Sequence, residues 1–286
     1  MAQGQNTSKR NPLVQDLIVT AGGFIASTAT AWVLYAMERW WDFSLYSLMV
    51  WFVLPAGALI AGMGAAGGYY AGARLADSRP TRMLLVNMVV VSASTFFAIH
   101  WLRYDAFVAS RGFGDRLPFW HYLDEVLTHQ SMTMRTNGAR MGDTGELGAL
   151  GYGVAALQIA GFALGGFIVY AALAKLPFCE RCARYLAKYG GQKRFADSAE
   201  SFGTMANTLV GRWNQGDLQA TLDLHRRWGL PKMSKTCRVM STFEHKQCPG
   251  CRVNWLHYKA QAFDGQHWKP VPGLDFASYH EGRLSA

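Results

Sequence analysis

Four of the five cysteines fall into two pairs with the same spacing, and these residues are the best suited to chemistry. The pairs are Cys179-Glu-Arg-Cys182 and Cys248-Pro-Gly-Cys251. A gap of two residues lets a tight turn direct both sulfurs at one ion, and two such pairs can supply four thiolates to one tetrahedral zinc. The sequence therefore predicts a zinc site formed by Cys179, Cys182, Cys248 and Cys251.

A zinc ion with four protein ligands is structural, because it keeps no open position for water or substrate. The chain offers it two ligands soon after an apolar segment that ends at Ala174, and two more near a distant turn. All five cysteines lie in this last part of the chain. We expect this part to be cytosolic, where thiols stay reduced and metal binding is favoured over disulfides.

Redox chemistry is the leading alternative for the pairs. Cys248-Pro-Gly-Cys251 resembles the motif of thioredoxin-type oxidoreductases, in which the first cysteine opens a helix and its pKa is lowered by the helix dipole. Here the residues after Cys251 alternate like a strand, and no βαβ pattern surrounds them. The sequence therefore favours a metal site.

Two further side chains could add to this chemistry. Cys237 has no partner at the paired spacing and is interpreted as a small buried residue on a strand, with a redox-sensitive thiol or a spare ligand as alternatives. His245 lies three residues before Cys248 and could replace a thiolate. Four cysteines make that replacement unnecessary.

The flanks of the second pair predict a β-hairpin. Residues 238–243 and 253–263 are rich in Val, Thr, Trp, Tyr and Phe and are interpreted as strands, so the second pair would cap their turn. Residues 183–230 are interpreted as helical. Each pair resembles a zinc knuckle, and the region resembles a zinc ribbon with a helical insertion. We therefore expect a small α+β cytosolic domain over residues 175–286.

The preceding part of the chain is organised by four long segments that carry almost no charge. They cover about 17–37, 46–73, 83–102 and 148–174. A helix needs roughly 20 apolar residues to cross the hydrocarbon core of a bilayer. We predict an α-helical membrane protein with a four-helix transmembrane bundle over residues 1–174, in which Pro55 kinks the second span.

Basic residues near the span ends give the orientation. Lys9 and Arg10 precede the first span, three Arg lie in the 74–82 turn, and four Lys and Arg follow the fourth span between Lys175 and Lys188. These three segments should face the cytoplasm, so both chain ends should lie there as well. The alternative is that the first apolar segment is a cleaved signal peptide.

Glycines four residues apart mark two predicted spans. Gly64, Gly68 and Gly72 lie in the second, and Gly161 and Gly165 lie in the fourth. Such spacing allows the backbone of a neighbouring helix to approach closely. We expect these two helices to pack against each other, with assembly of a homo-oligomer as the alternative.

The predicted outer loop, residues 103–147, contains a helical pattern from 117 to 130. This helix could lie with its apolar face in lipid or on the bundle. His121, Glu125 and His129 follow one another at four-residue spacing and form a second, weaker metal candidate. Residues 136–145 are polar and glycine-rich, and are interpreted as a mobile loop.

Charge is concentrated after the last span. Residues 175–286 hold 17 Lys and Arg and 9 Asp and Glu, so they supply +8 of the chain's net +9. A basic cytosolic domain beside the lipid bilayer can contact anionic headgroups. It could also bind nucleic acid, but the basic residues are scattered, and nucleic acid is not expected as a partner.

Three hypotheses for function follow. The first is a membrane-anchored scaffold or interaction protein whose zinc-bound tail contacts a cytosolic or membrane protein. The second is a transport or channel component that depends on Asn87 or Gln158, although no charged residue lies at mid-depth in the spans. The third is a membrane thiol oxidoreductase or another enzyme. No Walker or Rossmann loop, nucleophile elbow or His-Glu-x-x-His motif is present, so no active site is visible.

One resemblance rests on residues 147–170, the Cys179 knuckle and Tyr185. Here the chain resembles uncharacterised bacterial polytopic membrane proteins with a zinc-ribbon-like cytosolic tail. The resemblance implies a multi-pass protein of the bacterial inner (plasma) membrane, and it implies no activity.

Overall fold

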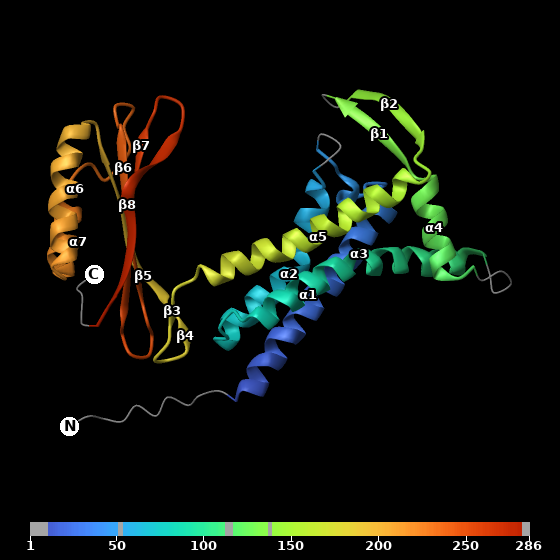
Figure 1. Ribbon diagram of the computed structural model, residues 1–286, viewed down its shortest axis with the longest axis horizontal. Coiled ribbons are helices and arrows are strands. Elements are labelled where there is room, and N and C mark those ends of the chain that lie inside the picture. Colours follow the sequence, from blue (N-terminus) through green and yellow to red (C-terminus); the bar gives the residue numbers. More distant parts are fainter. Residues whose placement is uncertain (1–10, 51–53, 112–116, 137–138, 282–286) are drawn as a thin grey trace. The chain divides into compact units, whose positions relative to one another are not determined.

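The computed structural model describes residues 11–50, 54–111, 117–136 and 139–281, and the chain divides into two compact units after Lys175. The basic residues Lys9 and Arg10 lie outside the described ranges. Each unit has its own core. Figure 1 shows the helices and strands of both units.

The N-terminal unit is a bundle of long helices with one short helix and one hairpin. Its elements are α1 (Pro12–Trp41), a 3-10 turn η1 (Leu45–Ser47), α2 (Ala56–Ala76), α3 (Arg82–Arg111), α4 (Phe119–His129), β1 (Ser131–Thr136), β2 (Ala139–Glu146) and α5 (Leu150–Ala174). Among the described residues, α1, α3 and α5 are long and apolar enough to cross a membrane. This agrees with a membrane protein, but it gives three candidate spans where the sequence predicted four.

The difference lies in the second predicted span, residues 46–73. Helix α2 begins only at Ala56, and the residues before it form η1 and an isolated β-bridge between Val50 and Leu54. Pro55 stands at the N-cap of α2, so the predicted kink inside this helix is wrong. A proline N–H is not needed at a helix start, which explains the position. The helix is rich in Gly and Ala, which contribute little hydropathy compared with Leu or Ile.

The glycine stripe of α2 packs against α1. A Cβ atom added at Gly68 would lie 1.9 Å from the backbone oxygen of Gly22. The same construction at Gly72 meets Val19, and at Gly64 it meets Thr30. The second and fourth predicted spans do pack against each other as expected, but this stripe of α2 faces α1 and not the fourth span.

The glycines of α5 do lie against α2, on a different face of that helix. A Cβ at Gly165 would meet backbone atoms from Leu59 to Met63, and one at Gly161 would meet Pro55 and Ala58. Helix α2 is therefore enclosed by α1 and α5, and its small side chains are what allow two close approaches. Of the two polar residues proposed for transport, Gln158 is buried in this bundle and Asn87 is partly buried.

The segment predicted as an outer loop is largely regular structure. Helix α3 continues to Arg111, and α4 matches the helix predicted at 117–130. Leu123 and Leu127 of α4 join the core formed by the long helices, so its apolar face lies on the bundle. The predicted mobile loop at 136–145 is wrong over β2, which pairs antiparallel with β1. Residues 137–138 lie outside the described part.

The C-terminal unit is an antiparallel sheet with two helices on one face. Its elements are β3 (Phe178–Cys179), β4 (Arg184–Tyr185), β5 (Ala187–Ala196), α6 (Ala199–Asn214), α7 (Leu218–Arg227), β6 (Val239–Gln247), β7 (Asn254–Phe263) and β8 (Trp268–His280). Strands β5 to β8 form one sheet in that order, and β3 pairs only with β4. Figure 1 shows α6 and α7 on the same side of the sheet.

The core of this unit lies between the helices and that face of the sheet. Phe202 and Leu209 of α6 and Leu222 of α7 pack with Phe243 of β6 and Tyr258 of β7. Side chains alternate in β7, so every second residue enters this core and the others point to the opposite face.

Two of the four sheet strands agree with the sequence prediction. Strands β6 and β7 confirm the predicted hairpin within a few residues at each end. The predicted helical stretch at 183–230 is correct for α6 and α7 but wrong over residues 187–196, which form β5. Strand β5 contains Gly190 and Gly191, and apolar and polar residues do not alternate regularly along it. It lies at the edge of the sheet.

Candidate metal centre

The first cysteine pair lies in a small hairpin at the start of the C-terminal unit. Strands β3 and β4 pair through Phe178 with Tyr185 and Cys179 with Arg184. Cys182 lies in the turn between them, and Ala183, directly after it, has a φ of 50°. This left-handed residue reverses the chain and returns the backbone into β4.

The second pair forms the turn between β6 and β7. The N–H of Arg252 donates to the carbonyl of Cys248 at 3.0 Å, and the N–H of Cys248 donates to the carbonyl of Val253 at 2.8 Å. Arg252, directly after the second cysteine, has a φ of 62°. Each pair is thus followed directly by a left-handed residue, and the two turns share this feature although 65 residues separate them in the chain.

The two turns bring all four sulfurs into one cluster. The Sγ atoms of Cys179, Cys182, Cys248 and Cys251 all lie within 4.8 Å of one another, and those of Cys179 and Cys251 are 3.4 Å apart. In a tetrahedral ion with metal–sulfur bonds of about 2.3 Å, the sulfurs would be about 3.8 Å apart. The predicted gathering of these cysteines is therefore seen, and the spacing fits a single metal ion.

The cluster is part of a small core of its own. Cys179 and Cys248 are buried with Leu186, and Val253 and Trp255 pack against them. The first hairpin lies outside the four-stranded sheet, so the cysteines link it to the β6–β7 turn. A metal ion here would hold the beginning of the unit to its central hairpin.

Burial makes ionisation of this cluster costly without a cation. It raises the pKa of the Cys179 thiol to about 12, since desolvation opposes the thiolate, and it raises the pKa of Cys182 as well. At Cys251 burial acts in the same direction, but hydrogen bonds from the Val253 N–H and the neighbouring thiols outweigh it and lower the pKa. A divalent cation among the sulfurs would stabilise all four thiolates together.

Neither spare ligand belongs to the cluster. The Nε2 atom of His245 lies 2.8 Å from Oδ1 of Asn254, so this ring is held within the sheet. Cys237 is buried before β6, and its sulfur is 3.2 Å from both the N–H and the hydroxyl of Ser234. Neither side chain is among the four grouped ligands.

The geometry also bears on the redox alternative. In this structure Cys179 lies in a strand and Cys248 follows one, so neither cysteine opens a helix. Helix dipoles therefore do not lower the pKa of these thiols in the way that a thioredoxin-type site requires.

The weaker metal candidate on α4 is not assembled. Within the described residues, the four cysteines form the one group of at least three potential metal ligands that lie close together. His121, Glu125 and His129 do not form such a group. The Nδ1 atom of His129 lies 3.0 Å from the backbone oxygen of Glu125 instead.

One contact in the centre was missed from the sequence. Gly250 fits against the first cysteine pair, since a Cβ at this position would lie 2.9 Å from the Sγ of Cys182. The Pro-Gly dipeptide between Cys248 and Cys251 was a visible signal for a tight turn. The neighbour that the turn approaches becomes visible only in the folded chain.

This chain matches no family model, no curated protein and no solved structure. Its function must therefore be inferred from its own sequence and geometry.

Proposed function

We propose that the protein is a membrane-anchored scaffold or interaction protein. In this proposal one structural zinc ion holds its C-terminal unit together, and that unit binds a protein partner in the cytosol. The observation that carries the proposal is a closed four-sulfur centre in the same unit as a sheet face that α6 and α7 leave open.

The donor set supports zinc as a structural ion. Four thiolates satisfy a tetrahedral ion and leave no position for a substrate. Thiolate sites of this kind hold zinc or iron, so metal analysis has to measure both. With its four positions filled, zinc would supply cross-linking rather than Lewis-acid chemistry.

The proposed topology has four crossings of a bacterial inner membrane, with both chain ends in the cytoplasm. Helix α2 supports it because 21 residues at 1.5 Å each give about 30 Å, the thickness of the hydrocarbon core. Its close packing along α1 and α5 supports a crossing beside them. The basic residues at the span ends and the free cysteines support the orientation.

The face of the sheet opposite α6 and α7 supports a partner surface. One end of this face adjoins the first cysteine hairpin, since the Tyr279 hydroxyl donates to the carbonyl of Phe178 at 3.4 Å. The rings of Trp255 and His257 of β7 are neighbours on this face with centroids 5.3 Å apart, and Lys246 lies over the Trp255 ring at 4.8 Å. Tyr279 of β8, opposite Trp255 in the register, is 55% exposed. Aromatic side chains with exposed rings are enriched at protein interfaces.

The charges on this face indicate what the partner would present. Lys188 and Lys246 are directly opposite in the β5–β6 register. The repulsion between these like charges would be reduced by a bound anionic group. Lys259 already pairs with Glu244 at 3.2 Å. Oδ1 of Asp275, an acid of β8 on the same face, lies 2.6 Å from Nε2 of His257. We propose that the occupant is an acidic segment of a protein, because among the described residues Lys188 and Lys246 form no ion pair on this face.

Photo-crosslinking in cells that make the full-length protein tests this proposal. A photoreactive residue at Ala277, exposed on the open face, should give one discrete protein adduct, while the same residue at Thr208, exposed on α6, should give none. The double substitution Lys188→Glu with Lys246→Glu should abolish the adduct. Identical adducts from both positions, an adduct removed by nuclease, or no adduct at all would overturn the proposal.

A further inference from the structure

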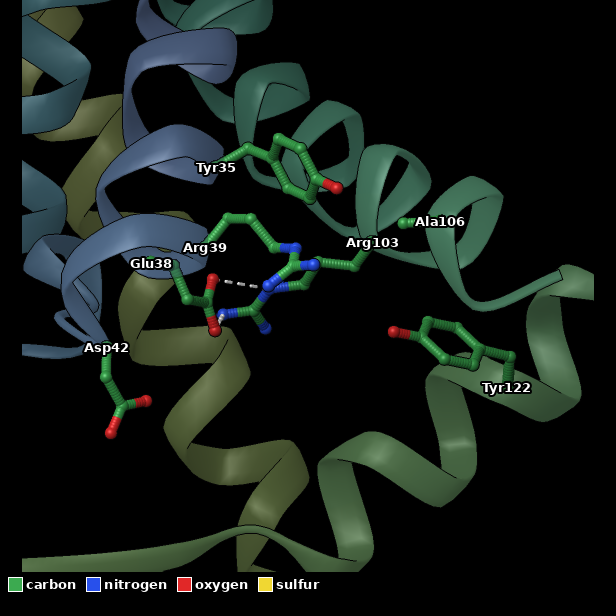
Figure 2. Close-up of a pocket in the computed structure, with 7 residues that line it drawn as sticks. All are labelled: Tyr35, Glu38, Arg39, Asp42, Arg103, Ala106 and Tyr122. Carbon is green, nitrogen blue, oxygen red and sulfur yellow. Dashed lines mark hydrogen bonds and ion pairs between the residues drawn. The ribbon is translucent and has the colours of Figure 1, made fainter. Parts of the chain in front are cut away.

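The N-terminal unit contains a cavity that the four-cysteine centre does not involve. It lies where the C-terminal part of α1 meets α3 and α4, and its volume is about 460 Å³ (Figure 2). The lining residues are mainly charged or aromatic: Tyr35, Glu38, Arg39, Asp42, Arg103, Ala106 and Tyr122.

Arg103 is fixed on one side of this cavity. Its Nε donates to Oε2 of Glu38 at 2.7 Å, and its Nη2 donates to the other carboxylate oxygen. The guanidinium also lies over the ring of Tyr46, 5.2 Å from the centroid. Because both oxygens of Glu38 are engaged by Arg103, this carboxylate is not available to neutralise a second cation.

Arg39 supplies that second cation. Among the described residues it makes no ion pair or hydrogen bond, and Figure 2 shows its guanidinium directed toward that of Arg103. Asp42, the other acid of the lining, is turned away from both guanidinium groups in the same view. Two guanidinium groups at one cavity, with Glu38 engaged by Arg103 and Asp42 turned away, favour an anionic occupant.

Two phenols complete the set of donors. The hydroxyl of Tyr122 points toward the guanidinium groups in Figure 2, and Tyr35 lies on the other side of them. Among the described residues neither hydroxyl has a hydrogen-bond partner. Arginine forks and hydroxyl donors together match the several acceptor oxygens of a phosphate group.

The surroundings indicate where this cavity would lie in a membrane. Trp40 and Trp41, at the end of α1, are 71% and 68% exposed. Trp101, two residues before Arg103, is 55% exposed. Exposed tryptophans at the ends of apolar segments favour the headgroup level of a bilayer.

We propose that this cavity binds a phosphate group, held between Arg39 and Arg103 with Tyr35 and Tyr122 as further donors. The group belongs to a phospholipid headgroup or to a soluble phosphate. The volume suits a headgroup or a small phosphate ester. This site is independent of the proposed zinc centre and of the proposed protein partner.

Binding to the full-length protein in neutral detergent tests the site. Delipidated protein is titrated in one arm with short-chain phosphatidylglycerol and in the other with inorganic phosphate, and bound molecules are counted by native mass spectrometry. We expect one bound molecule per chain in at least one arm, and the arm identifies the source. Competition of the lipid by inorganic phosphate would show that both use the same site.

The variants decide whether the cavity is responsible. Arg39→Gln removes the charge and leaves a shorter polar side chain, so the affinity should fall at least tenfold. Arg74→Gln, an exposed arginine in the last turn of α2 that lies outside the cavity lining, should change it less than twofold. The proposal is overturned if the two variants weaken binding equally, if neither weakens it, or if no phosphate source binds the wild-type protein.

Discussion

Gly250 and Cys182, one from each cysteine turn, are so close that a Cβ on the glycine would lie 2.9 Å from the cysteine Sγ. Real Cβ atoms do not approach a sulfur this closely, so Gly250→Ala must displace Cys182 within the cluster. Overpacking of this kind typically costs about 1–3 kcal/mol. We expect Gly250→Ala to lower the unfolding free energy of the C-terminal unit by that amount and to speed release of the metal to a chelator.

Gly203→Ala is the matched control for that substitution. It lies in α6 of the same unit, and a Cβ there meets no atom within 4 Å. Alanine in a helix is more favourable than glycine by roughly 0.5–1 kcal/mol, so stability should stay level or rise. Equal metal release from both variants would contradict the proposed contact.

Removing one ligand should remove the metal. We expect the full-length protein to contain one zinc per chain. The binding free energy of a structural zinc with four ligands is about 10 kcal/mol or more. Cys248→Ser removes one of these ligands and should therefore abolish tight zinc binding. Cys237→Ser is the control, since its sulfur contacts Ser234 and lies outside the cluster. Elemental analysis gives the zinc and iron content of both variants. Iron in place of zinc would identify a different centre, and equal loss in both variants would count against these four ligands.

The cysteine site could be predicted from the sequence because its ligands are a local pattern repeated twice. A spacing of two residues fixes the geometry of each turn, and thiol chemistry fixes what they bind. The β6–β7 hairpin was accessible for a similar reason, since its strands alternate and flank the second pair. Strand β5 was not, because an edge strand with Gly190 and Gly191 carries little alternation and depends on pairing with β6.

The bundle shows the same division between local and distant information. The apolar character of α1, α3 and α5 follows from composition alone. The partner of the Gly68 stripe does not, since glycine spacing indicates that a backbone will approach but not which one. The cavity was also missed, because its two opposite charges, Glu38 and Arg103, are 65 residues apart and meet only in the folded chain.

Close packing of α1 on α2 should make Gly68 sensitive to any side chain. A Cβ there would lie 1.9 Å from the backbone oxygen of Gly22, so Gly68→Ala forces the helices apart. We expect a loss of about 1–3 kcal/mol in unfolding free energy, measured by unfolding the full-length protein in mixed detergent micelles. Gly67→Ala, one residue away with nothing within 4 Å of its Cβ, should be neutral or stabilising. Equal effects at the two positions would argue against this interface.

His225 should make the C-terminal unit less stable in mild acid. Its side chain is 1% exposed, its Nε2 lies 3.0 Å from the Ser241 hydroxyl, and the rings of Phe243 and Tyr258 flank it. Burial, with the nearby Arg194 guanidinium, lowers the pKa of His225 from 6.5 to about 4. The folded state therefore holds the neutral imidazole.

The sign of the pH effect follows from that shift. Between pH 6.5 and 4 the unfolded chain binds a proton that the folded chain does not, so the unfolding free energy falls as the pH falls through this window. A shift of this size corresponds to about 3 kcal/mol. Above pH 7 His225 should contribute no pH dependence.

Amide hydrogen exchange of β6 in the full-length protein, corrected for intrinsic rates, measures this loss of unfolding free energy. His225→Gln keeps a polar group near Ser241 without the titration, so its exchange should depend less on pH. Protonation of the cysteine ligands affects both proteins equally, and parallel curves for the two would rule out His225 as the cause.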